Sequence, residues 1–136
     1  MKQLAAILLA VAAVDAAAAA SPVTGRWKTD DGKAIVEIGQ CGATVCGRIM
    51  RILAPTPNGP PRDDFNPDPK LRNRPIQGMM VLTGFTEQGN LWKGHIYSPE
   101  EGKTYRSTLR RNADGTLRVQ GCIAIFCKSI IWTPAR

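Results

Sequence analysis

The chain reads LWKGHIYSPEEGKTYRSTLR from Leu91 to Arg110. In the first half of this stretch, Trp92 and Ile96 fall on one face of an extended strand and His95 falls on the other. In the second half, apolar and polar positions alternate in the same way, and a Glu-Gly pair between the halves suits a turn. A period of two with one polar face is typical of an antiparallel sheet with one side in water. The stretch therefore predicts a β-hairpin.

The same pattern recurs along the chain. Asp or Asn beside Gly, which suits tight hairpin turns, interrupts extended segments at short intervals. We predict strands at residues 24–30, 34–41, 45–53, 79–86, 91–97, 103–110, 116–122 and 127–133. Eight strands joined by sequential hairpins predict an all-β fold, a small antiparallel up-and-down barrel whose interior holds side chains or one small ligand. The predicted interior set is Trp27, Val36, Ile38, Ile49, Val81, Trp92, Ile96, Tyr105, Leu109, Leu117, Val119 and Ile131.

The first twenty residues have the layout of a secretory signal peptide. Lys2 gives a positive start, an apolar run follows from Leu4 to Val11, and Ala18-Ala19-Ala20 supplies small residues for cleavage before Ser21. The alternative is a retained amphipathic anchor. We expect residues 1–20 to be removed and residues 21–136 to form a single domain in the periplasm or outside the cell.

The chain is basic, with 18 Lys and Arg against 11 Asp and Glu and a net charge of +7. A basic surface favours nucleic acid, anionic lipid or acidic polysaccharide. An exported protein rarely meets nucleic acid, and the basic residues are scattered, with Arg110-Arg111 as the longest run. We therefore expect no nucleic-acid partner, and keep an anionic envelope component as one partner class.

Four cysteines form two pairs with the same spacing, Cys41 with Cys46 and Cys122 with Cys127. Export favours disulfides over free thiols, and local pairing is predicted if each pair sits opposite across a hairpin with a four-residue loop. Pairing between the two segments is a second arrangement. A four-thiolate zinc site and redox chemistry are the alternatives to structural disulfides, and the C-x-x-C spacing of redox sites is absent.

Residues 54–77 break the rhythm of strands, because they contain six Pro before Pro75 and Pro cannot donate to a β-ladder. Mixed charges in this segment predict internal pairing; they are Arg62, Asp63, Asp64, Asp68, Lys70, Arg72 and Arg74, with Asn66 among them. A loop of this length is often functional, for example as a lid. The alternatives are a poorly ordered surface excursion and a calcium site built from these oxygen ligands, for which no EF-hand spacing is present.

Candidate ligand contacts combine apolar bodies with polar or adaptable ends. They are Trp92, Tyr97, Tyr105, Arg48, Met79 and Asn66, and the alternative for the aromatic members is core packing. Arg48 and Arg51 are predicted to point to opposite faces of one strand, so at most one faces inward. An inward Arg would favour an anionic ligand such as a fatty acid, because a buried cation needs a partner.

Catalytic patterns are not found in the sequence. His95, the single histidine, lies on the polar face of its strand, and Glu100 and Glu101 lie in a turn where neighbouring side chains diverge. The nucleophile-elbow, zincin and phosphate-loop motifs are absent. We therefore expect no enzymatic activity, no cofactor and no metal.

Gly25-Arg26-Trp27 resembles the G-x-W signature that opens lipocalin barrels, where the Trp plugs the closed end. The fuller pattern comprises Gly25, Trp27, Cys41-Gly42, Cys46-Gly47, Asn66-Pro67, Arg74-Pro75, Gly78, Trp92, Gly94, Tyr97, Pro99, Gly102-Lys103, Tyr105, Asp114-Gly115, Leu117, Gly121-Cys122, Cys127 and Trp132. This pattern is similar to that of the bacterial domain-of-unknown-function 2147 family.

The resemblance implies small exported proteins with a lipocalin-like (calycin-type) barrel. It also implies structural roles for Gly25, Trp27 and Trp132, and a late Arg, here Arg136, stacked on the plugging Trp. We predict an exported binding protein for a small apolar or amphipathic ligand, with residues 54–77 over the barrel mouth. The alternative is a non-enzymatic envelope module that uses its basic surface on acidic polymers or protein partners.

Overall fold

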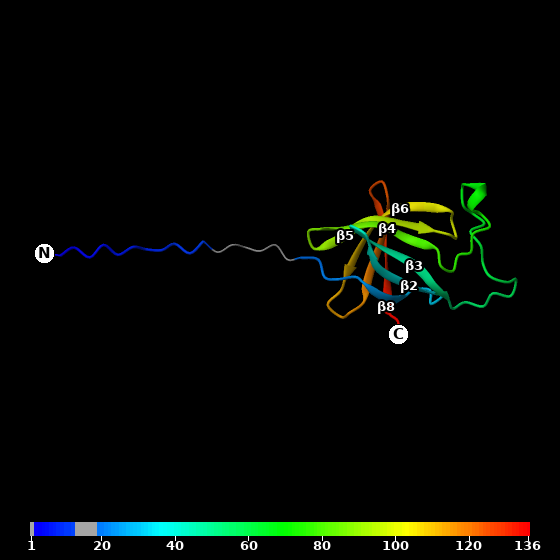
Figure 1. Cartoon of the computed structure of the whole chain (residues 1–136), viewed down its shortest axis with the longest axis horizontal. Helices are drawn as coiled ribbons and strands as arrows, with labels where there is room; N and C mark the ends of the chain where they lie inside the picture. Colours follow the sequence, from blue (N-terminus) through cyan, green and yellow to red (C-terminus); the bar gives the residue numbers. More distant parts are fainter. Residues whose placement is uncertain (1, 13–18) are drawn as a thin grey trace.

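The computed structural model describes residues 2–12 and 19–136, and its strands form a closed antiparallel barrel (Figure 1). The strands are β1 (Gly25–Lys28), β2 (Ala34–Cys41), β3 (Thr44–Ile52), β4 (Met80–Gln88), β5 (Leu91–Ser98), β6 (Lys103–Arg111), β7 (Leu117–Ile123) and β8 (Phe126–Pro134). Consecutive strands are neighbours, and β8 pairs with β1. The predicted up-and-down barrel is confirmed, and each strand lies within two residues of its expected bounds.

The two parts of the N-terminal segment that are described, residues 2–12 and 19–24, carry no helix or strand. Ala18, which belongs to the predicted cleavage site, lies outside the described residues. Among the residues described, no helix is long and apolar enough to cross a membrane.

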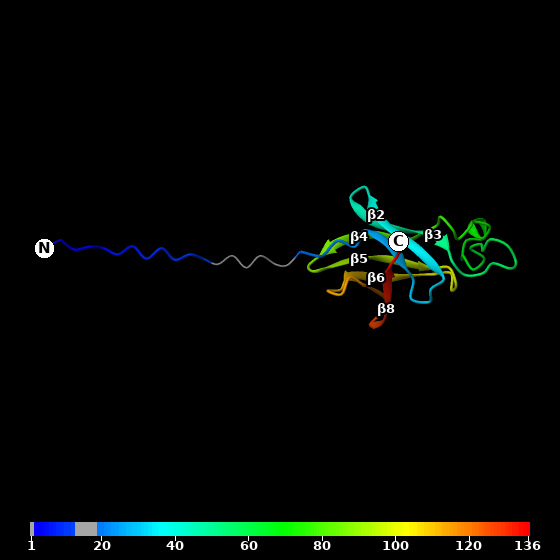
Figure 2. The same cartoon turned by 90° about the horizontal axis from the view of Figure 1, so that it is seen from below.

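The antiparallel connections give the barrel two different ends (Figures 1 and 2). We call the end with the N-terminal segment and the turns at 89–90 and 112–116 the closed end. The opposite end carries the turns at 29–33, 99–102 and 124–125 and the long loop at 53–79, which contains the short 3-10 helix η1 (Pro69–Leu71). We call it the open end, because a cavity described below reaches the surface there.

Trp27 seals the closed end. Its ring is almost fully buried, and its indole N–H donates to the carbonyl of Val23 at 2.9 Å. The guanidinium of Arg111 lies 5.4 Å from the ring centroid, at cation–π distance. The implied stacking of Arg136 on Trp27 is wrong, because β6 ends beside the ring with Arg111, whereas Arg136 follows the end of β8 and is exposed.

A continuous apolar core fills the barrel below the open end. Its most buried members, those under 2% exposed, are Val23, Trp27, Val36, Leu82, Phe85, Leu109, Leu117 and Val119. The predicted interior position of Ile131 is wrong: Ile131 is 44% exposed, and its neighbours Ile130 and Trp132 take the inward positions. All three side chains are apolar, so the sequence pattern did not decide which set faced inward.

A bulge in the β2–β3 ladder sets the direction of the two arginines of β3. Val36 pairs with Ile49, whereas the preceding residue, Ile35, pairs with Arg51. The extra residue on β3 shifts the alternation by one position. Arg48 and Arg51 are therefore both exposed, and the prediction that they point to opposite faces is wrong.

Both predicted disulfides are present, Cys41–Cys46 and Cys122–Cys127. Each closes a hairpin with a two-residue turn, not the four-residue loop that the prediction assumed. Cys122 lies directly opposite Cys127, whereas Cys41 lies opposite Thr44. The two staples thus hold the β2–β3 and β7–β8 hairpins, and all four cysteines are used.

The packing of Gly94 generates the first prediction. A Cβ at this position would lie 2.6 Å from the carbonyl oxygen of Thr83 and 2.7 Å from the ring of Phe85. Gly94→Ala should lower the free energy of unfolding by about 1–3 kcal/mol, since the core has no room for the methyl group. Gly39→Ala is the matched control, because its Cβ meets nothing within 4 Å. Urea unfolding of both variants measures the difference, and equal midpoints would contradict it.

Candidate functional site: a cavity at the open end

A cavity of about 720 Å³ lies at the open end of the barrel. This volume falls in the range of small-molecule sites, about 300–1,000 Å³. Its inner wall is formed by apolar side chains from five strands: Val36, Ile49, Ile52, Val81, Ile96, Ile130 and Trp132. Its rim is formed by the turn at 29–33, the turn after β5 and residues 54–62 of the long loop. The cavity therefore has an apolar interior and a mouth made of turns.

The prolines of the long loop form part of the rim. Pro55, Pro57, Pro60 and Pro61 all line the cavity. Proline has a fixed φ and no backbone N–H, so an irregular wall made of it presents apolar surface and leaves few donors unpaired. The loop predicted at 54–77 therefore covers one side of the mouth.

The base of the loop is pinched by backbone hydrogen bonds. The N–H of Asp63 donates to the carbonyl of Arg74 at 2.9 Å, and the N–H of Ile76 donates to that of Pro61 at 3.0 Å. Arg62 and Pro75 form an isolated antiparallel bridge at the same place. Residues 62–75 are thus a closed sub-loop at the mouth.

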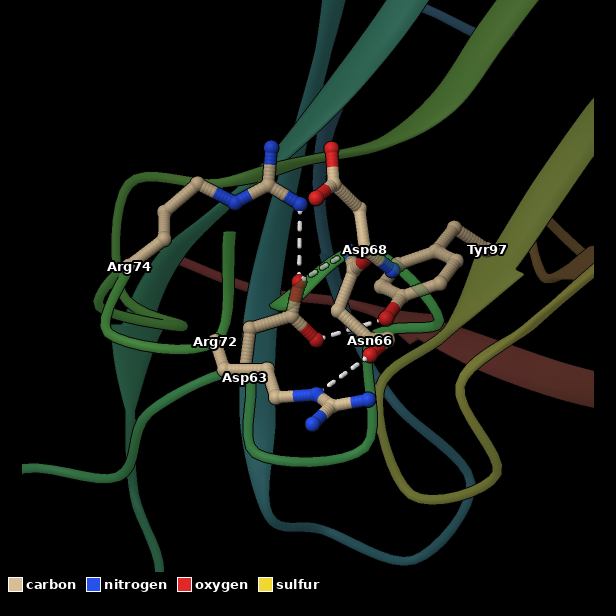
Figure 3. A network of polar contacts seen from close by, with 6 residues as sticks. All are labelled: Asp63, Asn66, Asp68, Arg72, Arg74 and Tyr97. Atoms are coloured by element: carbon tan, nitrogen blue, oxygen red, sulfur yellow. Dashed lines mark hydrogen bonds and ion pairs between the residues drawn. The ribbon is translucent and has the colours of Figure 1, made fainter. Parts of the chain in front are cut away.

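A buried carboxylate joins this sub-loop to the barrel (Figure 3). Asp63 is 0% exposed. The hydroxyl of Tyr97, at the end of β5, donates to Asp63 Oδ1 at 2.6 Å. The Asn66 amide and the Arg74 guanidinium each donate to Asp63 Oδ2 at 2.8 Å. Three donors therefore satisfy one carboxylate, and only Tyr97 comes from the barrel.

A second layer of contacts holds Asn66. Its side-chain oxygen accepts from the N–H of Asp68 at 2.9 Å, and its carbonyl accepts from Arg72 Nε at 2.8 Å (Figure 3). The backbone of Phe65 packs on Gly102 in the β5–β6 turn so closely that a Cβ there would lie 1.8 Å from the Phe65 oxygen. The predicted internal pairing of the loop is confirmed, and the loop is anchored to the barrel rather than free.

The network shifts two pKa values. Burial alone would raise the pKa of Asp63, but hydrogen bonds from Tyr97, Asn66 and Arg74 outweigh burial and hold that pKa below its usual value. Burial and the neighbouring Asp63 carboxylate raise the pKa of Tyr97 to about 12. At pH values between the two pKa values, Asp63 is charged and Tyr97 is neutral, and the hydrogen bond from the Tyr97 hydroxyl to the Asp63 carboxylate requires these two states.

The structure brings together two of the six predicted ligand contacts. Tyr97 lines the cavity, and Asn66 holds the loop behind it. The other four lie elsewhere. Trp92 is at the closed end, where its indole N–H donates to the carbonyl of Ser21 at 3.0 Å, and Met79 belongs to the core. Arg48 is on the outer surface, and the hydroxyl of Tyr105 donates to Glu101. The cavity therefore lies at the opposite end of β5 from Trp92.

Two residues of the site have roles that the sequence did not indicate. In the sequence Asp63 is one of several loop charges, and the family resemblance implies a structural role for Trp132. Trp132 lines the cavity, and its indole N–H is buried without a hydrogen-bond partner among the described residues. The signal for Asp63 was weak, because its barrel partner Tyr97 lies 34 positions further along the chain.

The buried carboxylate of the loop is already engaged by neighbouring donors. The oxygens of Asp63 already accept from three donors. Within residues 2–12 and 19–136, no group of three or more His, Cys, Asp or Glu side chains converges as metal ligands would. The geometry instead suits the enclosure of an apolar molecule.

Comparison with known proteins agrees with this architecture. Residues 25–134 match the model of the family described as "Uncharacterized protein conserved in bacteria (DUF2147)". A solved structure titled "Protein HP1028 from the human pathogen Helicobacter pylori belongs to the lipocalin family" is similar, with a TM-score of 0.75 and 22% identity over 85% of this chain and 84% of that chain. At this identity, the likeness shows the fold alone. No curated protein matches the chain.

The second prediction concerns the hydrogen bond between Tyr97 and Asp63. Tyr97→Phe removes one of the three donors to a buried charge, so the free energy of unfolding should fall by about 1.5–3 kcal/mol. Tyr105→Phe is the matched control, because its partner Glu101 is exposed and solvent replaces the lost hydrogen bond, so the loss should be clearly smaller than for Tyr97→Phe. Urea unfolding at neutral pH measures both, and equal losses would contradict the proposed anchor.

The third prediction is the pH range of the anchor. The folded pKa of Asp63 is lowered, so its contribution to stability is present above the ordinary value of 3.8 and is lost as the pH falls through the folded pKa. The folded pKa of Tyr97 is raised, so its contribution is present below 10.0 and is lost as the pH rises through about 12. We expect constant stability from this network between the two limits.

The sequence has two tyrosines, so Tyr105→Phe leaves Tyr97 as the single phenol. Its ultraviolet absorbance in the native variant should titrate with a midpoint of about 12. The same variant in denaturant should titrate near about 10. A native midpoint at the denatured value would show that Tyr97 does not face a buried carboxylate.

Proposed function

Because the chain belongs to the DUF2147 family of uncharacterized bacterial proteins, whose description gives no activity, we propose its function from the cavity: the protein binds a small apolar or amphipathic ligand inside the barrel. The observation that carries this proposal is the cavity of about 720 Å³, with apolar side chains inside and turns at its mouth. A barrel of eight strands has room for one small ligand at most.

The energetics of such a site are favourable for an alkyl chain. Each buried methylene contributes about 0.8 kcal/mol, so ten of them contribute about 8 kcal/mol. The loss of translational and rotational freedom costs at least about 4 kcal/mol. The difference is at most about 4 kcal/mol, which corresponds to a dissociation constant of about 1 mM or weaker for the alkyl chain alone. Contacts at the mouth would then supply the remaining affinity and the selectivity.

Charges at the mouth favour some head groups over others. The cavity-lining ionisable residues are Asp30, Asp31, Lys33, Arg62, Asp64 and Glu100, four acids against two bases. Lys33 and Glu100 pair at 3.9 Å across the mouth. Because Arg48 and Arg51 are outside the barrel, the residues that would have favoured a fatty acid do not reach the ligand. We expect a neutral or cationic head group to bind better than a carboxylate.

Two features support export to the periplasm or beyond. The disulfides suit an oxidising compartment. Within residues 2–12 and 19–24, the hydrogen bonds from the N-terminal segment to other strands of the barrel begin at Ala20: the Ala20 N–H donates to Glu87 at 2.9 Å, and the Ser21 carbonyl accepts from Trp92. Removal of residues 1–20 would leave the seal around Trp27 intact.

The alternative, an envelope module that acts through its basic surface, has weaker support. Arg110 and Arg111 form the longest basic run, but Arg111 stacks on Trp27 and its guanidinium reaches the carbonyl of Pro22 at 3.4 Å. Arg111 is thus part of the closed end. Charge reversal at Arg110 alone tests this alternative without disturbing Trp27.

The fourth prediction is saturable binding of an apolar probe. N-phenyl-1-naphthylamine should gain fluorescence with the protein, and dodecylamine and dodecanol should displace it at lower concentrations than dodecanoate does. Ala34→Phe places a ring in the cavity and should weaken probe binding at least about tenfold, since its volume competes with the ligand. Ala113→Phe, the same change on an exposed turn at the closed end, should leave binding unchanged.

Fluorescence titration measures the probe affinity of the wild type and of both variants. Equal weakening by the two substitutions would place the probe on the surface. Probe binding abolished by raised salt but insensitive to Ala34→Phe would favour the basic-surface alternative.

A further inference from the structure

The tip of the β7–β8 hairpin is apolar and exposed. Ile123, Ile125 and Phe126 are 59%, 88% and 76% exposed, and Ala124 between them is exposed as well. Figures 1 and 2 show this hairpin projecting from the side of the barrel. Four consecutive apolar residues in water contribute nothing to the core, so folding does not account for their chemistry.

The backbone conformation of the turn is a second sign that folding does not account for the residues at the tip. Ala124 has a φ of 50°, the one non-glycine residue with positive φ among the described residues. The two-residue turns after β2 and β4 use Gly42 and Gly89 for such angles. Gly, Asn or Asp would suit the turn at Ala124 better than Ala, both for its backbone and for its contact with water. An unfavourable residue at an exposed tip points to a role in contact with another surface.

The tip is also held rigid. Cys122 and Cys127 lie opposite each other and form a disulfide at its base. The guanidinium of Arg106, on the neighbouring strand β6, donates to the carbonyl of Ala124. A preformed tip loses little conformational entropy when its side chains are buried by a partner.

Two exposed basic residues lie beside the tip. Arg106 of β6 is paired with Cys122, and Lys128 of β8 is paired with Gly121. Lys128 lies two residues beyond Phe126 and is exposed. A partner surface of complementary charge is therefore anionic.

The shape of the tip favours a lipid surface over a protein. Stable protein interfaces bury about 800 Å² and about 20 residues on each side. A projecting turn with three large apolar side chains is far smaller than that. A bilayer interface, in contrast, accepts a few apolar side chains and binds basic residues beside them at its anionic head groups.

We propose that residues 122–128 are a membrane-contacting tip. Ile123, Ile125 and Phe126 enter the interfacial layer of a bilayer that contains anionic lipid, and Arg106 and Lys128 lie at its head groups. The site is independent of the cavity, and the proposal holds whether or not the barrel binds a ligand.

Flotation with vesicles of phosphatidylglycerol and phosphatidylcholine tests the proposal on the full chain. The double substitution Ile125→Ser and Phe126→Ser should weaken binding at least about tenfold. Lys128→Gln should weaken it roughly fivefold. Ile131→Ser, an exposed position of β8 away from the tip, is the matched control and should bind as the wild type does. The N-terminal apolar stretch is the same in every variant, so differences between variants report the tip.

A second measurement reads the tip directly. The indole introduced by Phe126→Trp should be quenched by brominated phosphatidylglycerol and not by vesicles of phosphatidylcholine alone. Absence of this quenching, or flotation of the double variant equal to that of the wild type, would overturn the proposal. Sedimentation velocity adds one more outcome that would overturn it: a wild-type dimer that the double substitution dissociates would assign the tip to a second copy of the chain.

Discussion

Closure of the sheet is the constraint on which the rest of the structure depends. The closing strand β1 is short, and its ladder with β8 contains two residue pairs, Trp27 with Pro134 and Lys28 with Thr133. Closure therefore relies on packing inside the barrel as well as on hydrogen bonds, and Trp27 supplies it by filling the end where β1 begins. Large side chains gathered at that end leave the other end hollow. The plug at Trp27 and the cavity at the open end thus both follow from the uneven distribution of large side chains along the barrel.

The long loop forms one wall of the cavity at the open end, and ordering this loop costs conformational entropy. Ordering each residue of a loop costs about 1–2 kcal/mol, and prolines reduce this cost because they restrict the unfolded chain. Asp63 offsets a further part of this entropic cost, because its buried carboxylate has all its hydrogen-bond donors only when the loop lies against Tyr97. A buried charge that loses a partner is strongly destabilising. The carboxylate therefore selects one position of the loop over its alternatives.

The sequence predicted what depends on local alternation and failed where distant segments meet. The strands and the Pro-rich loop follow from patterns within a few residues. The bulge that turns Arg51 outward leaves no mark on that pattern, because it is fixed by pairing with Ile35. The choice between Ile131 and Trp132 as the inward residue was equally open, because both are apolar. The bond between Tyr97 and Asp63 depends on the path of the loop, which only the folded chain defines.

The two disulfides serve hairpins with different chemistry. Cys41–Cys46 closes a turn that has a glycine where the backbone needs one, so that hairpin is satisfied in water. Cys122–Cys127 closes a turn that lacks glycine and exposes apolar side chains, so the staple there holds a conformation that the turn residues themselves disfavour. The alternation of antiparallel connections brings this apolar tip out at the same end of the sheet as the long loop. One end of the barrel therefore carries both an exposed apolar turn and the mouth of the cavity.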